Sequence, residues 1–158
     1  AFRHLPHVVA SASDAEDADG VTAWLIAEME RRQALFMACG VDTFKKYNHV
    51  ETPHAASLHA DVDPLPLLIA IVDEFADVAI LRGLRSEFYR DLQRLVAKAA
   101  SFGIVLVLAT QNPKAEVVNT LIRDNCATRI AFKCESPPSA ERSDHRAARR
   151  GTSTAHQR

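Results

Sequence analysis

The sequence predicts an α/β domain built on a parallel sheet. Two continuous apolar runs, at residues 67–72 and 104–109, have the composition of strands that are buried on both faces of such a sheet. Between them, apolar residues recur at helical spacing. The order of strand, helix and strand is typical of doubly wound sheets with right-handed crossovers.

A long helix is predicted ahead of the first strand, from about residue 20 to residue 38. Acidic residues at 14–19 suit the start of a helix, an apolar face runs along it, and Gly40 is a plausible stop. Within it, Arg31 and Arg32 either face a neighbouring subunit or DNA, or lie on a solvated face of the helix.

A surface loop is predicted at residues 48–64, which contain prolines and small residues. Its three histidines, His49, His54 and His59, are spaced by five. Ordinary loop histidines are the default interpretation, and a metal site is the minor alternative.

Two helices and a short strand complete the predicted domain. The first helix leads from the first strand toward Gly103; its apolar positions are Phe88, Leu92, Leu95, Val96 and Ala99. A second helix is predicted around residues 117–122, and a third, shorter strand at residues 129–132.

Composition narrows the class of protein. With 158 residues, of which 47% are hydrophobic and 25% charged, the chain resembles an average globular domain and is neither fibrous nor wholly disordered. No apolar run approaches the roughly 18 residues that span a bilayer. Three cysteines without ligand-like spacing exclude zinc or a disulfide framework as the organising principle.

Charge is distributed unevenly along the chain. Residues 137–158 hold five arginines and two acids, for a net charge of +3, and no large apolar residue. We therefore expect this tail to be disordered, with phosphate contacts as an alternative to a solvated end. Residues 1–136 carry 14 Lys+Arg against 18 Asp+Glu, for a net charge of −4, which is not an obvious nucleic-acid footprint.

Polar residues follow both predicted strands directly. Asp73 and Glu74 come after the first strand, and Thr110, Gln111 and Asn112 come after the second. Ligands of open α/β sheets bind beyond the carboxyl ends of the strands. We therefore expect both groups to lie at the same edge of the sheet.

Two acids after an apolar strand form a Walker B arrangement. Asp73 is suited to hold the water shell of Mg²⁺, a hard cation that keeps several waters. Glu74 is suited to orient and deprotonate a water that attacks a γ-phosphate. The amide of Gln111 is suited to sense that phosphate. The alternative is that the two acids only cap the following turn.

Several stretches resemble one family. Residues 71–77 resemble the Walker B segment of FtsK/SpoIIIE-type DNA translocases, and residues 108–111 resemble the sensor strand that follows it. Further likeness runs through about residues 5–136 in the family's order, which is more specific than any one motif.

The resemblance implies a RecA-like P-loop NTPase fold, here partial, with a parallel sheet and flanking helices. It implies a homo-hexameric ring that moves double-stranded DNA using ATP and Mg²⁺, in chromosome segregation or conjugative transfer. Asp73, Glu74 and Gln111 would be catalytic, Asp73 would hold the metal through water, and Thr110 would contact the nucleotide. A cytoplasmic location is expected; intact family members are often anchored to the membrane through a region absent here.

The sequence also departs from the family. None of its five glycines is followed by Lys, so the phosphate-binding loop Gly-x-x-x-x-Gly-Lys-Ser/Thr is absent from these residues. In the family this loop would lie upstream of residue 1. We therefore expect residues 1–136 to be part of a motor domain that is inactive alone. Residues 98–103 lack the Arg that many members carry there, and Asn112 stands where many have Arg, so the trans-acting Arg is unidentified.

Two other functions stay open at this stage. One is a non-catalytic remnant or ring-assembly partner that keeps the fold without ATPase activity. The other is a related motor of a secretion system.

Overall fold

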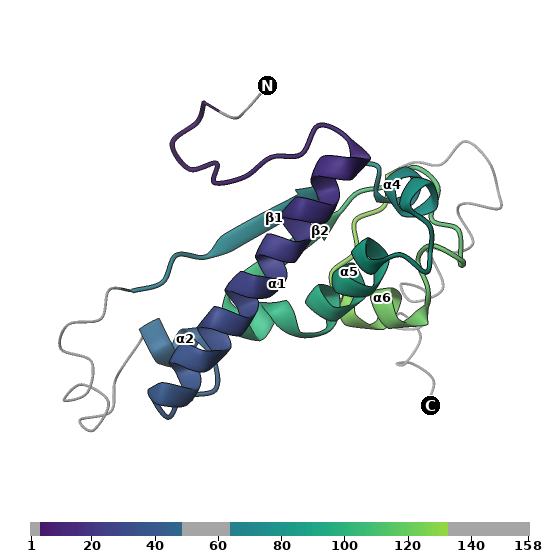
Figure 1. Cartoon of the computed structure of the whole chain (residues 1–158). Coiled ribbons are helices and arrows are strands. Elements are labelled where there is room, and N and C mark those ends of the chain that lie inside the picture. Colours follow the sequence, from purple (N-terminus) through teal and green to yellow (C-terminus); the bar gives the residue numbers. More distant parts are fainter. Residues whose placement is uncertain (1–3, 49–63, 133–158) are drawn as a thin grey trace, which may run out of the picture. The chain divides into compact units, whose positions relative to one another are not determined.

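The structure, a computed structural model, describes residues 4–48 and 64–132 (Figure 1). The chain forms two compact units, residues 1–125 and 126–158. In the described part, all helices and strands lie in the first unit. In chain order they are α1 (Ala15–Ala38), α2 (Phe44–Asn48), β1 (Leu68–Val72), α4 (Phe75–Arg82), α5 (Glu87–Lys98), the 3₁₀ helix η1 (Ala99–Phe102), β2 (Ile104–Leu108) and α6 (Thr120–Asn125).

The two strands form a parallel sheet, as predicted. Leu68 pairs with Ile104, and the register continues to Val72 opposite Leu108. The connection between them contains α4, α5 and η1. The first two predicted strands and the helix before Gly103 are thus confirmed, with small differences at their ends.

Helices cover one face of this sheet (Figure 1). The core there joins α1 and α5 to η1 and β2; its buried members are Leu25, Ile26, Met29, Leu95, Ala99 and Ile104. Leu68, Ala70 and Leu106 of the strands pack against it. Alternate residues of a strand point to opposite faces, so these side chains define the covered face.

The opposite face of the sheet is exposed among the described residues. Ile69 is 61% exposed, Ile71 70% and Val107 44%. The prediction that both strands are buried on both faces is therefore wrong for this part of the chain. Its physical reason is that α1 and α5 pack on the same side, which leaves the alternate apolar residues uncovered.

The first helix begins earlier than predicted. Asp14 adopts an extended backbone conformation, and its side chain accepts a hydrogen bond from the backbone N–H of Asp17 at 2.8 Å. This is an N-cap, which satisfies a donor that has no partner within the helix. Helix α1 therefore starts at Ala15 and includes most of the acids that were expected to precede it.

Three predictions beyond the sheet have different outcomes. The predicted strand at residues 129–132 is wrong, since these residues form no strand in the structure. A strand needs ladder hydrogen bonds to a neighbouring strand, and an apolar composition does not supply one. Helix α6 begins only at Thr120. The three loop histidines and the tail at 137–158 lie outside the described residues.

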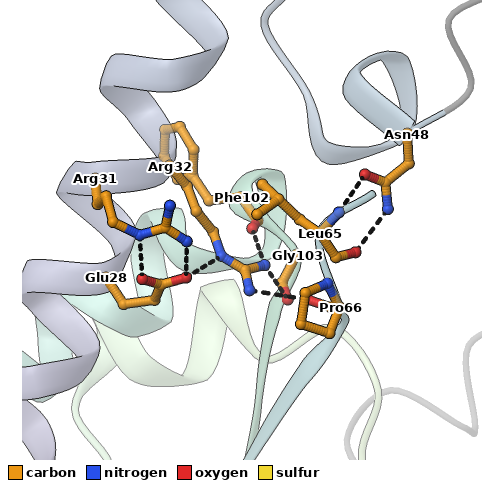
Figure 2. A network of polar contacts seen from close by, with 8 residues as sticks. All are labelled: Glu28, Arg31, Arg32, Asn48, Leu65, Pro66, Phe102 and Gly103. Carbon is orange, nitrogen blue, oxygen red and sulfur yellow. Dashed lines mark hydrogen bonds and ion pairs between the residues drawn. The ribbon is translucent and has the colours of Figure 1, made fainter. Parts of the chain in front are cut away.

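Arg32 of α1 is buried in a polar network (Figure 2). Its Nε donates to Glu28 Oε1 at 2.7 Å. The two Nη atoms donate to backbone carbonyls at 2.9 Å (Phe102), 3.3 Å (Gly103) and 2.8 Å (Pro66). A cation that is only 1% exposed therefore joins α1 to the segments that lead into β1 and β2. The expectation that Arg32 faces DNA, a subunit or solvent is wrong.

Arg31, by contrast, is on the surface of the same helix turn. Its side chain is 53% exposed and forms a two-point ion pair with Glu28, at 2.7 and 2.8 Å. This hydrogen bond from Arg31, with a further contribution from Arg32, holds the pKa of the Glu28 carboxyl below its usual range, although partial burial opposes the effect.

Two further contacts fix the chain ahead of the strands. The side-chain amide of Asn48 donates to the carbonyl of Leu65 at 2.8 Å and accepts from its N–H at 3.0 Å (Figure 2). Gly103, directly before β2, has φ +72°, and a Cβ built there would lie 2.2 Å from a ring carbon of Phe44. Only glycine fits this position, because the backbone is left-handed and the aromatic ring fills the space.

In the described part of the chain, no helix combines the length and apolar character that crossing a bilayer requires.

Candidate active site

The carboxyl ends of β1 and β2 lie side by side, held by backbone hydrogen bonds. The N–H of Ala109 donates to the carbonyl of Val72 at 2.9 Å, and the N–H of Phe75 donates to the carbonyl of Ala109 at 2.8 Å. Ala109 thus hydrogen-bonds both to the residue before the Asp73-Glu74 turn and to the residue after it. The prediction that the two polar groups share one edge of the sheet is confirmed.

Glu74 has an unusual backbone conformation. Its φ of 46° and ψ of 49° place it in the left-handed region, and it is the only non-glycine residue with positive φ in the described ranges. Such a conformation costs about 1–2 kcal/mol for a residue with a Cβ. The hydrogen bonds at Ala109 offset this strain, since they hold the residues directly before and after the turn. Strain of this kind concentrates at functional sites.

The carboxylate of Glu74 contacts the residues that follow β2. Its Oε1 accepts a hydrogen bond from the Thr110 hydroxyl at 3.0 Å and another from the backbone N–H of Gln111 at 3.2 Å. The Thr110 oxygen in turn accepts from the N–H of Asn112 at 3.1 Å. The structure therefore brings Glu74, Thr110 and Gln111 together through their polar atoms.

Asp73 and Gln111 complete the predicted set. Asp73 is exposed, and its Oδ1 accepts from the N–H of Glu74 at 3.0 Å. Gln111 is also exposed; it joins the network through its backbone N–H. A carboxylate at a strand tip thus remains accessible to a ligand beyond the sheet edge.

The donor set fits magnesium only together with a substrate. No group of three or more His, Cys, Asp or Glu side chains is arranged for a metal ion in residues 4–48 and 64–132. Magnesium commonly takes one or two carboxylates, several waters and the phosphates of a nucleotide. Asp73 suits that mode of binding, and the edge is not a dedicated metal cage.

Two features of this edge, the left-handed turn at Glu74 and the contact from Glu74 to Thr110, are not visible in the sequence pattern. Helix α4 begins at Phe75, directly after the turn, and buries Phe75, Ala76 and Ala79. The alternative that the acids only cap the following turn is met in part: Asp73 Oδ1 accepts from the N–H of Glu74, and Glu74 stands at the N-cap of α4 without a side-chain capping bond. Nothing in the sequence signals the left-handed turn or the contact from Glu74 to Thr110.

A family model described as "FtsK/SpoIIIE family" matches residues 1–149. The chain belongs to the FtsK/SpoIIIE family. Among curated relatives, it is 35% identical over 149 residues to the DNA translocase FtsK of Vibrio parahaemolyticus, covering 83% of this chain and 14% of that protein. It is 34% identical over 136 residues to the DNA translocase SftA of Bacillus subtilis, covering 85% of this chain and 14% of that protein.

The fold has a counterpart among solved structures. The conjugation coupling protein TcpA of pCW3, in its monomer form with ATPγS, matches with a TM-score of 0.54 and 20% identity. The match covers 72% of this chain and 31% of that chain. This likeness confirms the predicted partial RecA-like fold, with its parallel sheet and flanking helices.

The chain matches only a part of its relatives, and that part contains the carboxyl edge of the sheet. The chain spans about 14% of the length of the two curated relatives, so their activity as whole proteins is not carried over directly. The matched region includes the Asp73-Glu74 turn and the Thr110-Gln111 segment.

Proposed function

We propose that this chain supplies the Walker B side of an ATP-hydrolysing site in a motor that moves double-stranded DNA. The observation that carries the proposal is the hydrogen-bonded group of Glu74, Thr110 and Gln111 beside the exposed Asp73, at the carboxyl ends of two parallel strands. This is where ligands of open α/β sheets bind. The relatives named as DNA translocases support the choice of DNA as the substrate that is moved.

Each residue of the edge has a proposed task. Asp73 holds the water shell of Mg²⁺, which when bound neutralises charge on the phosphates. Glu74 orients a water and accepts its proton while the water oxygen bonds to the γ-phosphorus and the bond from that phosphorus to the β-phosphate oxygen breaks. Gln111 responds to the loss of the γ-phosphate. A direct contact from Thr110 to the nucleotide stays a prediction.

The proposal includes the assembly expected of the family. A homo-hexameric ring around double-stranded DNA brings the Walker B edge of one subunit near its neighbours, and a cytoplasmic location belongs to the same expectation. Segregation and conjugative transfer are both compatible with relatives named as DNA translocases and a fold neighbour named as a conjugation coupling protein.

A second candidate is a ring partner without ATPase activity of its own. The specific observation that favours it is the lack of a Gly-x-x-x-x-Gly-Lys-Ser/Thr loop within the 158 residues. That loop supplies backbone N–H groups and a Lys to the phosphates, so these 158 residues by themselves do not hold the part of such a site that contributes most of the affinity for a nucleotide.

Reconstitution of hydrolysis separates the two candidates. The 158-residue chain is mixed with a family segment that carries the phosphate-binding loop, and phosphate release is measured with ATP, Mg²⁺ and double-stranded DNA. We expect DNA-stimulated hydrolysis that the chain alone does not show. Glu74→Gln should lower it by about 10²–10⁴-fold, because the base is lost while the side chain keeps its size.

Glu87→Gln is the matched control for this experiment. Glu87 is an exposed glutamate in the first turn of α5 and takes no part in the hydrogen bonds that join Glu74 to Thr110 and Gln111, so the variant should hydrolyse ATP like the unchanged chain. A mixture that binds nucleotide at the added loop but never hydrolyses it would favour the non-catalytic ring partner. Stimulation by a secreted polypeptide instead of DNA would favour the secretion motor.

A further inference from the structure

The hydroxyl of Thr110 both donates and accepts a hydrogen bond in the structure. A threonine hydroxyl has a single proton to donate, and that proton goes to Glu74 Oε1 at 3.0 Å. Its oxygen also accepts from the N–H of Asn112 at 3.1 Å. The hydroxyl therefore cannot donate to a phosphate oxygen while it donates to Glu74.

The same contact determines where the Glu74 carboxylate lies. Oε1 receives two donors, the Thr110 hydroxyl and the Gln111 N–H, both from the segment after β2. The backbone of Glu74 is held as well, since the residues on either side of the turn hydrogen-bond to Ala109. The main chain and the side chain of Glu74 are thus both held by residues 109–111. Oε2, which accepts no hydrogen bond from the described residues, is the oxygen available to a water.

We propose that Thr110 is a positioning residue for Glu74: its hydroxyl aims the carboxylate at the water and is not a ligand of the nucleotide. This inference rests on the proposed function, because it assigns the base a partner within the same site. It deepens that function by stating what Thr110 does there. It also predicts a distinct kinetic signature, since a positioning residue changes the rate of the chemical step and a ligand changes binding.

Three variants and one control separate these roles. Thr110→Val keeps the shape of the side chain and removes the hydroxyl, and Thr110→Ser restores it. Glu74→Ala removes the carboxylate. Thr22→Val is the matched control, because the buried Thr22 hydroxyl donates only to backbone carbonyls within α1.

The first measurement needs no hydrolysis. The amide proton of Gln111 is followed by NMR in the 158-residue chain without nucleotide. Glu74→Ala should move this resonance upfield, because its acceptor is gone, and Thr110→Val should move it in the same direction. Thr110→Ser and Thr22→Val should leave it in place. A Gln111 resonance that stays in place in Thr110→Val, whether or not Glu74→Ala moves it, would overturn the proposal.

The second measurement uses the reconstituted ATPase. Thr110→Val should lower kcat by about ten- to a hundredfold, with KM for ATP changed less than about twofold, and Thr110→Ser should recover most of the rate. A raised KM with unchanged kcat would make Thr110 a nucleotide ligand, which overturns this inference and leaves the proposed function standing. If the unchanged chain never hydrolyses ATP, the proposed function fails, and the NMR comparison alone decides whether Thr110 positions Glu74.

Discussion

The two ends of the β1–β2 pair are both joined by polar side chains, and they differ in burial and in charge. At the amino ends, Arg32 reaches from α1 to the carbonyls of Pro66 and Gly103, and its side chain is 1% exposed. At the carboxyl ends, Glu74 accepts from Thr110 and Gln111, and the edge is open beside it.

This difference suggests that the amino ends of the strand pair serve the stability of the fold and that the carboxyl ends serve chemistry. A buried cation whose three nitrogens each donate to an acceptor contributes to the fold and is inaccessible to a substrate. A carboxylate at an open edge, on a residue with φ +46°, contributes little to stability and is available to react. Substitutions at the amino ends should therefore change unfolding, and those at the carboxyl ends should change hydrolysis.

The largest effect on stability is expected at Arg32. Arg32→Met removes the buried cation and leaves three backbone carbonyls without their donor, which should lower the free energy of unfolding by about 3–5 kcal/mol. The control is Arg31→Met, which loses only an exposed pair with the same glutamate and should cost less than about 1 kcal/mol. Urea denaturation measures both. Equal losses in the two variants would show that burial at Arg32 is unimportant.

A smaller effect is expected at Gly103. Gly103→Ala places a methyl group against the ring of Phe44 and strains a left-handed backbone, for a combined cost of about 2–4 kcal/mol. Gly40→Ala has a similar φ, +66°, with nothing within 4 Å of the new Cβ, so it should cost only the strain, about 1–2 kcal/mol. The difference between their thermal midpoints isolates the contact with Phe44. If the two midpoints coincide, that contact does not restrict the position.

At the carboxyl ends, Thr110→Val should change stability little. It removes two hydrogen bonds, one to the Glu74 carboxylate and one from the exposed N–H of Asn112. Both partners lie close to solvent, so the loss should be about 0.5–1.5 kcal/mol. The same urea denaturation tests this value. A loss as large as that of Arg32→Met would mean that both ends of the sheet are structural, and the contrast between them would disappear.

The smallest effect is a dependence on pH at Glu28. Its pKa in the folded chain lies below the ordinary 4.5, chiefly because of the hydrogen bond from Arg31. A depressed folded pKa means that the carboxylate stabilises the fold above pH 4.5, and that this stabilisation is lost as the pH falls through the folded pKa. The difference between the urea midpoints at neutral and acidic pH should therefore be smaller for Glu28→Gln than for the unchanged chain. An identical pH profile for the variant and the unchanged chain would contradict this assignment.

Local patterns in the sequence predict the framework well. Apolar runs give both strands, and helical spacing gives α1 and α5 with errors only at their ends. The common edge of Asp73-Glu74 and Thr110-Gln111 follows from the parallel order of the strands, because parallel strands present their carboxyl ends on one side. These features depend on residues close together in the chain.

Features that depend on distant residues are not predicted. From the sequence alone, Arg32 looks like a surface cation. In the fold it is surrounded by the carbonyls of Phe102, Gly103 and Pro66, which lie up to 71 positions away in the sequence. The strand at 129–132 is predicted from composition alone, and composition does not supply a neighbouring strand. The contact of Glu74 with Thr110 is missed for the same reason, since its geometry arises only when the two strand ends meet.

The central claim is that the carboxyl edge carries chemistry that the amino edge does not. The most direct measurement is DNA-stimulated phosphate release by the reconstituted mixture, taken together with the urea midpoint of the same chain, for Glu74→Gln. We expect hydrolysis to fall by at least about a hundredfold while the free energy of unfolding changes by less than about 1 kcal/mol. Hydrolysis that continues at the rate of the unchanged chain would contradict the account.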